Sequence, residues 1–125
     1  MFAIDSDKTI LCTRGDAAVF AVKATVDGAD YEFRMGDVLR FTVFEKKNCA
    51  AIVLSKDTPV SSASQSVTVS LSGSDTKIGG IISKPADYWY EVELNPDTNP
   101  QTIIGYDEDG PKVFRLFPEG KEQEA

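Results

Sequence analysis

Residues 66–72 read SVTVSLS, and their strict alternation of polar and apolar side chains decides the fold class. Val67, Val69 and Leu71 share one side of an extended chain, and the serines and the threonine between them share the other. This period of two is typical of an antiparallel strand with one buried and one solvated face. The stretch therefore predicts a β-sheet protein.

The same period recurs on both sides of this stretch. Residues 18–26 and 37–45 alternate in the same way, and residues 49–56 form a short apolar run between polar turns. Residues 57–66, DTPVSSASQS, are predicted to form a long connection because they are polar and rich in serine. No segment carries a capped helical stripe.

Turn signals divide the rest of the chain. Asp27-Gly28 suits a tight hairpin turn, so we expect Val26 and Ala29 to be near cross-strand neighbours. Near the C-terminus, the turn-rich sequence DEDG is expected to close a last hairpin between QTIIGY and PKVFRLF.

The count is eight or nine short strands with turns roughly every 8–12 residues, the pattern of an antiparallel β-sandwich or barrel. The length of 125 residues suits one domain, which we place at residues 1–117, with a frayed tail at 118–125. The predicted core comprises Phe20, Val22, Leu39, Phe41, Val43, Ile52, Leu54, Val67, Val69, Leu71, Tyr88, Tyr90, Val92, Leu94, Ile103, Phe114 and Leu116.

Composition excludes several functions. The formal net charge is −7, from 13 basic and 20 acidic residues, and this surface repels a phosphate backbone, so we expect no nucleic-acid partner. No apolar run approaches the ~20 residues of a membrane helix, so we expect no membrane partner. The N-terminal MFAIDSDK has neither a basic nor an apolar region, so we expect no signal peptide.

The chain contains no histidine, which removes Ser-His-Asp and Cys-His catalysis and histidine metal sites. We therefore predict no catalytic, cofactor-binding or metal site. Cys12 and Cys49 are expected to be free thiols because the export signal is missing. Acidic clusters such as DSD, DGAD and DEDG could hold calcium, but loop carboxylates on an acidic protein are more often solvated.

Arg14-Gly15-Asp16 spells an adhesion tripeptide between two strand-like runs. An adhesion ligand needs its Arg and Asp displayed on a protruding loop. Since only four residues separate the runs here, we predict a bend in which Gly15 supplies a special backbone conformation.

Trp89 is the candidate for a binding platform. If Tyr90 and Val92 fill the core, then Trp89, Glu91 and Glu93 share the outer face of one strand. An outward Trp could stack on a sugar or anchor a subunit interface. Glu91 and Glu93 could in principle form a glycosidase pair, although any half-exposed strand would alternate in this way.

The order of motifs resembles a family. TRGD with VF.V, then DG..Y.F..GDVLRFTV, LSKDT, VTVSLSGSDTKI, ADYWYEVEL and TIIG follow one another between about Thr9 and Phe117. This order resembles small proteins of phages and prophages of Firmicutes that are similar to the N-terminal domain of the baseplate upper protein of lactococcal-type phages. Relatives commonly have a Gly before the Y.Y strand, where KPAD stands here.

The resemblance implies an immunoglobulin-like sandwich that serves as a building block of a tail, baseplate or fibre. It implies other virion proteins, and copies of the chain itself, as partners, and assembly in the bacterial cytoplasm. It carries no catalytic residues. A small carbohydrate-binding module is the alternative, with a glycan on Trp89.

Overall fold

The structure, a computed structural model, describes residues 2–26, 28–48, 50–108 and 110–119, and within these ranges it is all-β with no helix. The predicted all-β class is confirmed, but there are more strands than the eight or nine expected. Strands of three residues are too short to show an alternating pattern. The strands are β1 (Phe2–Ile4), β2 (Ile10–Thr13), β3 (Ala18–Val22), β4 (Ala24–Val26), β5 (Ala29–Tyr31), β6 (Val38–Phe44), β7 (Ile52–Pro59), β8 (Val67–Leu71), β9 (Ala86–Leu94), β10 (Gln101–Ile104) and β11 (Lys112–Phe117).

Seven strands form the larger sheet, in the order β1-β2-β11-β9-β6-β7, with β10 also paired to β9. The long strands β6 and β9 lie inside it and carry its central ladder, from Leu39 opposite Leu94 to Phe44 opposite Trp89. Strands β1 and β7 are its edges.

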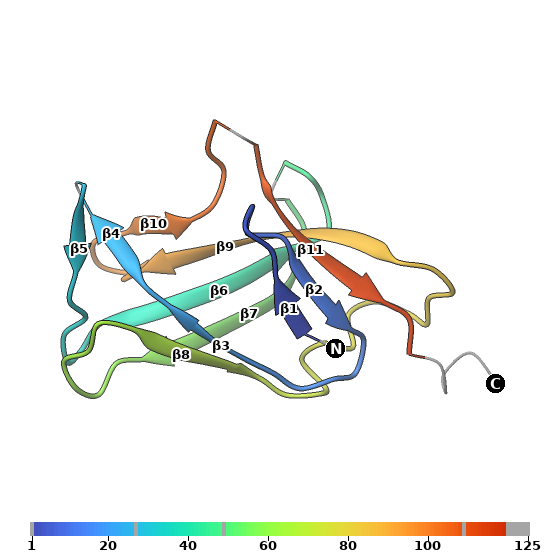
Figure 1. Cartoon of the computed structure of the whole chain (residues 1–125), viewed down its shortest axis with the longest axis horizontal. Coiled ribbons are helices and arrows are strands. Elements are labelled where there is room, and N and C mark those ends of the chain that lie inside the picture. The colour runs from blue at the N-terminus through green and yellow to red at the C-terminus, as the bar shows by residue number, and fades with distance from the viewer. Residues whose placement is uncertain (1, 27, 49, 109, 120–125) are drawn as a thin grey trace.

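The smaller sheet pairs β3 with β8 and faces the larger one. Figure 1 shows β3 and β8 together along the lower side of the view, with β6 and β9 above them. Phe20 of β3 and Phe41 of β6 meet edge to face across the interior, with ring centroids 5.5 Å apart. Beyond Lys23 the chain continues as β4, which pairs with β5. There Val26 lies opposite Ala29, as predicted, while Asp27 lies outside the described residues.

Most of the predicted core residues are buried or packed against the core, but Ile52 is not. A register shift between β6 and β7 after Val43 leaves Val53 without a partner and places Ile52 opposite Phe44. Because a shift of one residue turns a strand's side chains to the other face, Ile52 points outward and is 64% exposed. The prediction for Ile52 is therefore wrong.

One strand pair is parallel, which the predicted antiparallel pattern did not include. β2 runs parallel to β11, with Leu116 opposite Cys12. After Thr13 the chain leaves β2 and continues in the smaller sheet as β3. β2 and β11 are therefore not joined by a hairpin, which would have made them antiparallel. The N–H of Arg14 donates to the carbonyl of Phe117 at 2.9 Å and extends this pairing.

The predicted last hairpin is also wrong. β10 and β11 do not pair with each other; both pair with β9, β10 at Val92–Leu94 and β11 at Ala86–Tyr90. Together they act as one strand interrupted by the loop at 105–111, in which Asp107 and Gly110 form a bridge. The turn residues that suggested a hairpin thus form a local excursion from one strand.

The polar stretch at 57–66 is only partly a connection. Residues 57–59 belong to β7, because Asp57 pairs with Arg40 and Pro59 ends the strand opposite Val38. Of the predicted tail, Pro118 and Glu119 are half-buried, and the remaining residues lie outside the described ranges.

Candidate binding face

Strand β9 places the predicted platform residues on the outer face of the larger sheet. Tyr90 and Val92 are buried in the core. Trp89, Glu91 and Glu93 alternate with them and are half-buried. The alternation in the sequence therefore placed these residues on the correct face, but the Trp89 side chain is only partly exposed.

Apolar neighbours flank Trp89 on both sides. Phe44 of β6 and Val113 of β11 are its cross-strand partners. Phe44 is 6% exposed yet lies outside the core cluster, so it is buried on the outer face. Ile52 lies opposite Phe44 on β7, and Val53 beside it is also exposed. We call Ile52, Val53, Phe44 and Trp89 the edge patch, since they run from the open edge of β7 onto the face.

Glu91 and Glu93 lie beside the edge patch. Neither side chain has a hydrogen bond or ion pair among the described residues. Burial raises the pKa of Glu91, and the nearby carboxylate of Glu93 adds to the rise. Two residues along a strand span about 6.6 Å, so both carboxylates leave the same face of β9 as close neighbours.

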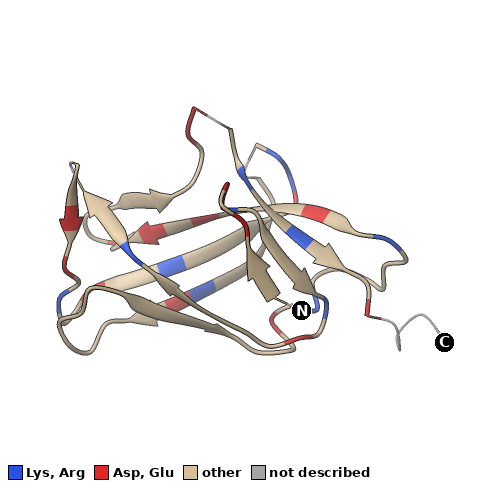
Figure 2. Ribbon diagram, viewed as in Figure 1, with Lys and Arg blue, Asp and Glu red and all other residues tan. Residues whose placement is uncertain are grey.

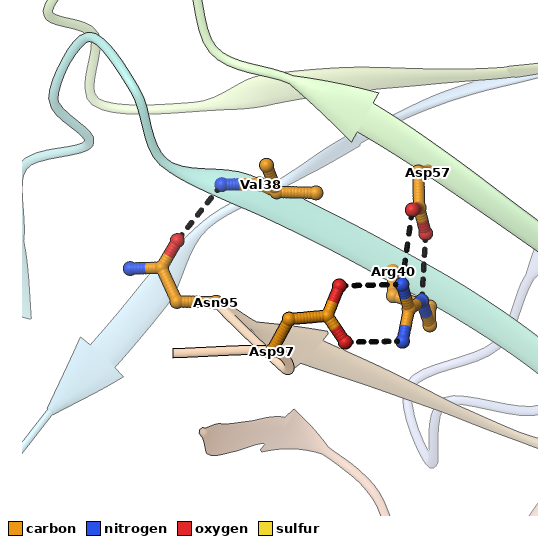
Figure 3. A network of polar contacts seen from close by, with 5 residues as sticks. All are labelled: Val38, Arg40, Asp57, Asn95 and Asp97. Atoms are coloured by element: carbon orange, nitrogen blue, oxygen red, sulfur yellow. Dashed lines mark hydrogen bonds and ion pairs between the residues drawn. The ribbon is translucent and has the colours of Figure 1, made fainter. Parts of the chain in front are cut away.

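Arg40 explains why Glu93 has no ion pair. Although Arg40 lies opposite Glu93, its guanidinium binds Asp57 of β7 and Asp97 of the turn after β9, as Figure 3 shows. Its Nε donates to Asp57 Oδ1 at 2.8 Å, and its Nη2 donates to Asp97 Oδ2 at 3.1 Å. Both contacts are bidentate, and they raise the pKa of Arg40.

A second polar network closes the same end of the sheet. The Asn95 side chain accepts a hydrogen bond from the N–H of Val38 at 2.9 Å (Figure 3) and donates one to Asp37. The Asp37 carboxylate also accepts from the Tyr31 hydroxyl at 2.8 Å. Asn95 has a φ of 49°, in the left-handed region that Asn tolerates better than most residues. The network holds the turn after β9 against the start of β6.

Arg14-Gly15-Asp16 is a bend between β2 and β3, as predicted, and its arginine points inward. Arg14 is 7% exposed. Its Nη2 donates to the carbonyl of Gly79 at 2.9 Å, and its Nε donates to that of Ile78 at 3.3 Å. Gly15 has a φ of +90°. Sequence reasoning assigned the bend but missed the side chain's structural role, because its partners lie more than sixty residues away.

The Cys12 thiol is free and fully buried, and burial raises its pKa to about 11. A thiol in this state is a poor nucleophile because the thiolate is the reactive form. Cys49 lies outside the described residues.

Charges of both signs are distributed over the strands, as Figure 2 shows. In the described ranges, no three Cys, Asp or Glu side chains gather into a group that could hold a metal ion. Asp107, from one of the acidic clusters, forms an ion pair with Lys112, whose Nζ lies 2.7 Å from Asp107 Oδ1.

The described residues include no helix that is long and apolar enough to cross a membrane. No family model, curated protein or solved structure matches this chain.

Proposed function

We propose that this chain is a non-enzymatic structural protein of a phage or prophage virion, which joins other tail, baseplate or fibre proteins through the open side of its larger sheet. The order of sequence motifs suggests the setting. The observation that carries the binding role is the edge patch, because it joins an unpaired strand edge to an apolar face.

The edge itself supports this role. β7 has eight residues and, among the strands that the structure describes, pairs with β6 alone, so every second residue directs its N–H and C=O groups away from the sheet. Long open edges pair readily with other chains unless charge or proline blocks them. Lys56, Asp57 and Pro59 protect the C-terminal half of β7, whereas Ile52 and Val53 leave its N-terminal half apolar.

The adjoining face adds affinity and specificity. Aromatic residues at the centre of an apolar patch contribute most to protein interfaces. Phe44 lies on the strand next to β7, and Trp89 lies on the strand beyond it, so a partner whose strand pairs with β7 reaches Trp89 only where it also lies over the outer face of the sheet. Partners of this kind are other virion proteins or further copies of this chain.

Ile52→Lys tests the edge patch, with Val19→Lys as its matched control. The two aliphatic side chains are 64% and 63% exposed, but Val19 lies on β3, away from the patch. Light scattering across a concentration series measures self-association, and co-purification with tail proteins encoded beside the gene measures partner binding. We expect Ile52→Lys to weaken association at least about tenfold and Val19→Lys to leave it unchanged.

A protein that stays monomeric at every concentration and captures no virion protein would contradict the proposal. Gene neighbours unrelated to phage would contradict its virion setting. Equal effects of the two substitutions would remove the edge patch as the binding surface.

A carbohydrate-binding module is the second candidate, and the outward position of Trp89 favours it. Trp89 is half-buried between its cross-strand partners Phe44 and Val113, so only part of its ring is open to a sugar. Glycan-array binding that Trp89→Ala abolishes would establish this function in place of the first.

A further inference from the structure

A cleft of about 440 Å³ separates the two sheets on the side of β3 that faces away from β8. Its walls come from β3 on one side and from β1, β2, β9 and β10 on the other. The volume falls in the range of protein ligand sites, roughly 300–1,000 Å³.

The cleft follows the edge of β3. Four consecutive residues, 20–23, line it. Because successive side chains of a strand point to opposite faces, a cavity that touches four in a row must run along the strand's edge. That edge has no strand partner in the described part of the chain, where β3 pairs with β8 alone. Half of the β3 backbone N–H and C=O groups therefore face the cleft without a strand partner.

The opposite wall is aliphatic. Ile10 is buried, Ile103 and Ile104 are half-buried, and Ile4 is 42% exposed. Two neighbouring isoleucines line one cleft because the pairing of β10 with β9 shifts register between Thr102 and Ile104. Such an irregularity turns a side chain that would otherwise point away. The wall thus offers apolar surface to any chain that lies along β3.

Two lysines complete the lining. Lys8 and Lys23 are exposed, and their ammonium groups have no ion-pair partner among the described residues. They are the only charged residues among those that line the cleft, and the carboxylate of Asp7, which precedes Lys8 in the chain, accepts a hydrogen bond from the N–H of Thr9 at 3.0 Å. This hydrogen bond and one that the Tyr90 hydroxyl donates to the Lys8 carbonyl at 2.5 Å hold the backbone at Lys8 in place.

We propose that this cleft accepts an extended peptide segment of a partner protein, with aliphatic and acidic side chains in alternation. The segment adds a strand to the open edge of β3, which supplies main-chain hydrogen bonds. Its aliphatic side chains cover the isoleucine wall, and its acidic side chains pair with Lys8 and Lys23. This site is separate from the edge patch, and the inference does not rest on the proposed function.

The probe is the capped peptide Ac-EVEVEV-NH2, titrated to millimolar concentration against the isotope-labelled full chain by NMR. We expect shift changes in residues 18–23 and in Ile103 and Ile104. Methylating alternate backbone nitrogens of the peptide, so that its pairing edge loses its donors, should weaken binding at least about tenfold.

Charge reversal gives a second readout. Lys23→Glu should weaken binding of the acidic peptide roughly tenfold and improve binding of Ac-KVKVKV-NH2, whereas Lys84→Glu, an exposed lysine away from the cleft, should change neither. Circular dichroism checks that each variant is folded, which we expect because both lysines are exposed.

Absence of peptide binding at millimolar concentration would overturn the proposal. So would binding that ignores both backbone methylation and Lys23→Glu, or shift changes confined to β7. Binding of decanoate in residues 18–23 without any binding of the peptide would also overturn it, by showing a site for a small apolar anion. Because Ile52→Lys should not affect peptide binding, this test and that of the edge patch can fail separately.

Discussion

The Asn95 side chain donates a hydrogen bond to the Asp37 carboxylate at 3.1 Å, across a sequence separation of 58 residues. Asp37 also accepts hydrogen bonds from the Arg34 N–H and the Tyr31 hydroxyl. Burial acts to raise the pKa of Asp37, but these three hydrogen bonds outweigh it and lower the pKa. The ionised carboxylate is therefore part of the structure that joins β6 to the turn after β9.

Asp37→Asn should lower the free energy of unfolding by about 1–3 kcal/mol near pH 7, because one buried acceptor becomes a donor. Because the pKa of Asp37 is lower in the folded state, its ionised carboxylate stabilises the fold at pH values above the unfolded pKa of ~3.9. This stabilisation is lost as the pH falls through the folded pKa. The difference from the natural chain should therefore shrink toward about pH 2. Chemical denaturation at both pH values measures it. Asp30→Asn is the control, since Asp30 is exposed on β5 and its carboxylate accepts no hydrogen bond in the described structure. A pH-independent loss of stability in Asp37→Asn would contradict the assignment.

Arg14→Met should destabilise the fold by about 1–3 kcal/mol, because it leaves the carbonyls of Ile78 and Gly79 without their donors. Arg14→Lys should recover only part of this loss, since one ammonium cannot reproduce the guanidinium's planar set of donors. Thermal melting of the two variants decides the point. If Arg14→Met melted like the natural chain, the arginine would have no structural role, and an adhesion role for Arg14-Gly15-Asp16 would have to be considered again.

Gly15→Ala should cost roughly 1–2 kcal/mol, because φ at this position is +90°. The added Cβ would also lie 2.5 Å from Glu119 Oε2, a contact that the flexible side chain can relieve. Gly80→Ala is the control, because φ there is not positive and nothing lies within 4 Å of its Cβ position. Similar melting temperatures for both variants would exclude backbone strain in the bend.

Phe41→Asp should abolish folding, because Phe41 is 1% exposed and contacts the rings of Phe20, Tyr90 and Phe114. Ile52→Asp should change the free energy of unfolding by no more than about 0.5 kcal/mol, as expected for an exposed position. Circular dichroism melts compare the two. A cooperative transition in Phe41→Asp, or a collapse of Ile52→Asp, would show that the faces of β6 or β7 are assigned incorrectly.

Cys12 should resist thiol reagents in the folded state. Its pKa is raised to about 11 by burial, so little thiolate forms near neutral pH. In a Cys49→Ser background, a chromogenic disulfide reagent should react with Cys12 only at the rate of unfolding, and rapidly in denaturant. Fast labelling of the folded variant would contradict the burial of this strand.

The sequence predicted the faces of long strands well, and the reason is physical. In β8 and β9, the alternation of side chains runs over five and nine residues, so the sequence alone shows which side chains are buried. Ile52 was misplaced because a register shift depends on the partner strand, which a local pattern does not contain. The parallel pairing of β2 with β11 was likewise invisible, since it joins segments a hundred residues apart.

The candidate site was predicted in part. Alternation located Trp89 on the outer face, but Phe44 beside it comes from another strand. The cleft along β3 left no mark in the sequence, because its two walls meet only in the folded chain.

The pairing of β2 with both β1 and β11 also determines how the chain connectivity could be changed by circular permutation. Phe2 lies opposite Cys12, and Cys12 lies opposite Leu116, so two interstrand spacings, about 10 Å, separate the first strand from the last. A short linker could join them, and the loop at 105–111 already interrupts the final strand. A circular permutant opened in that loop would keep every strand pairing while its new termini lay between β10 and β11.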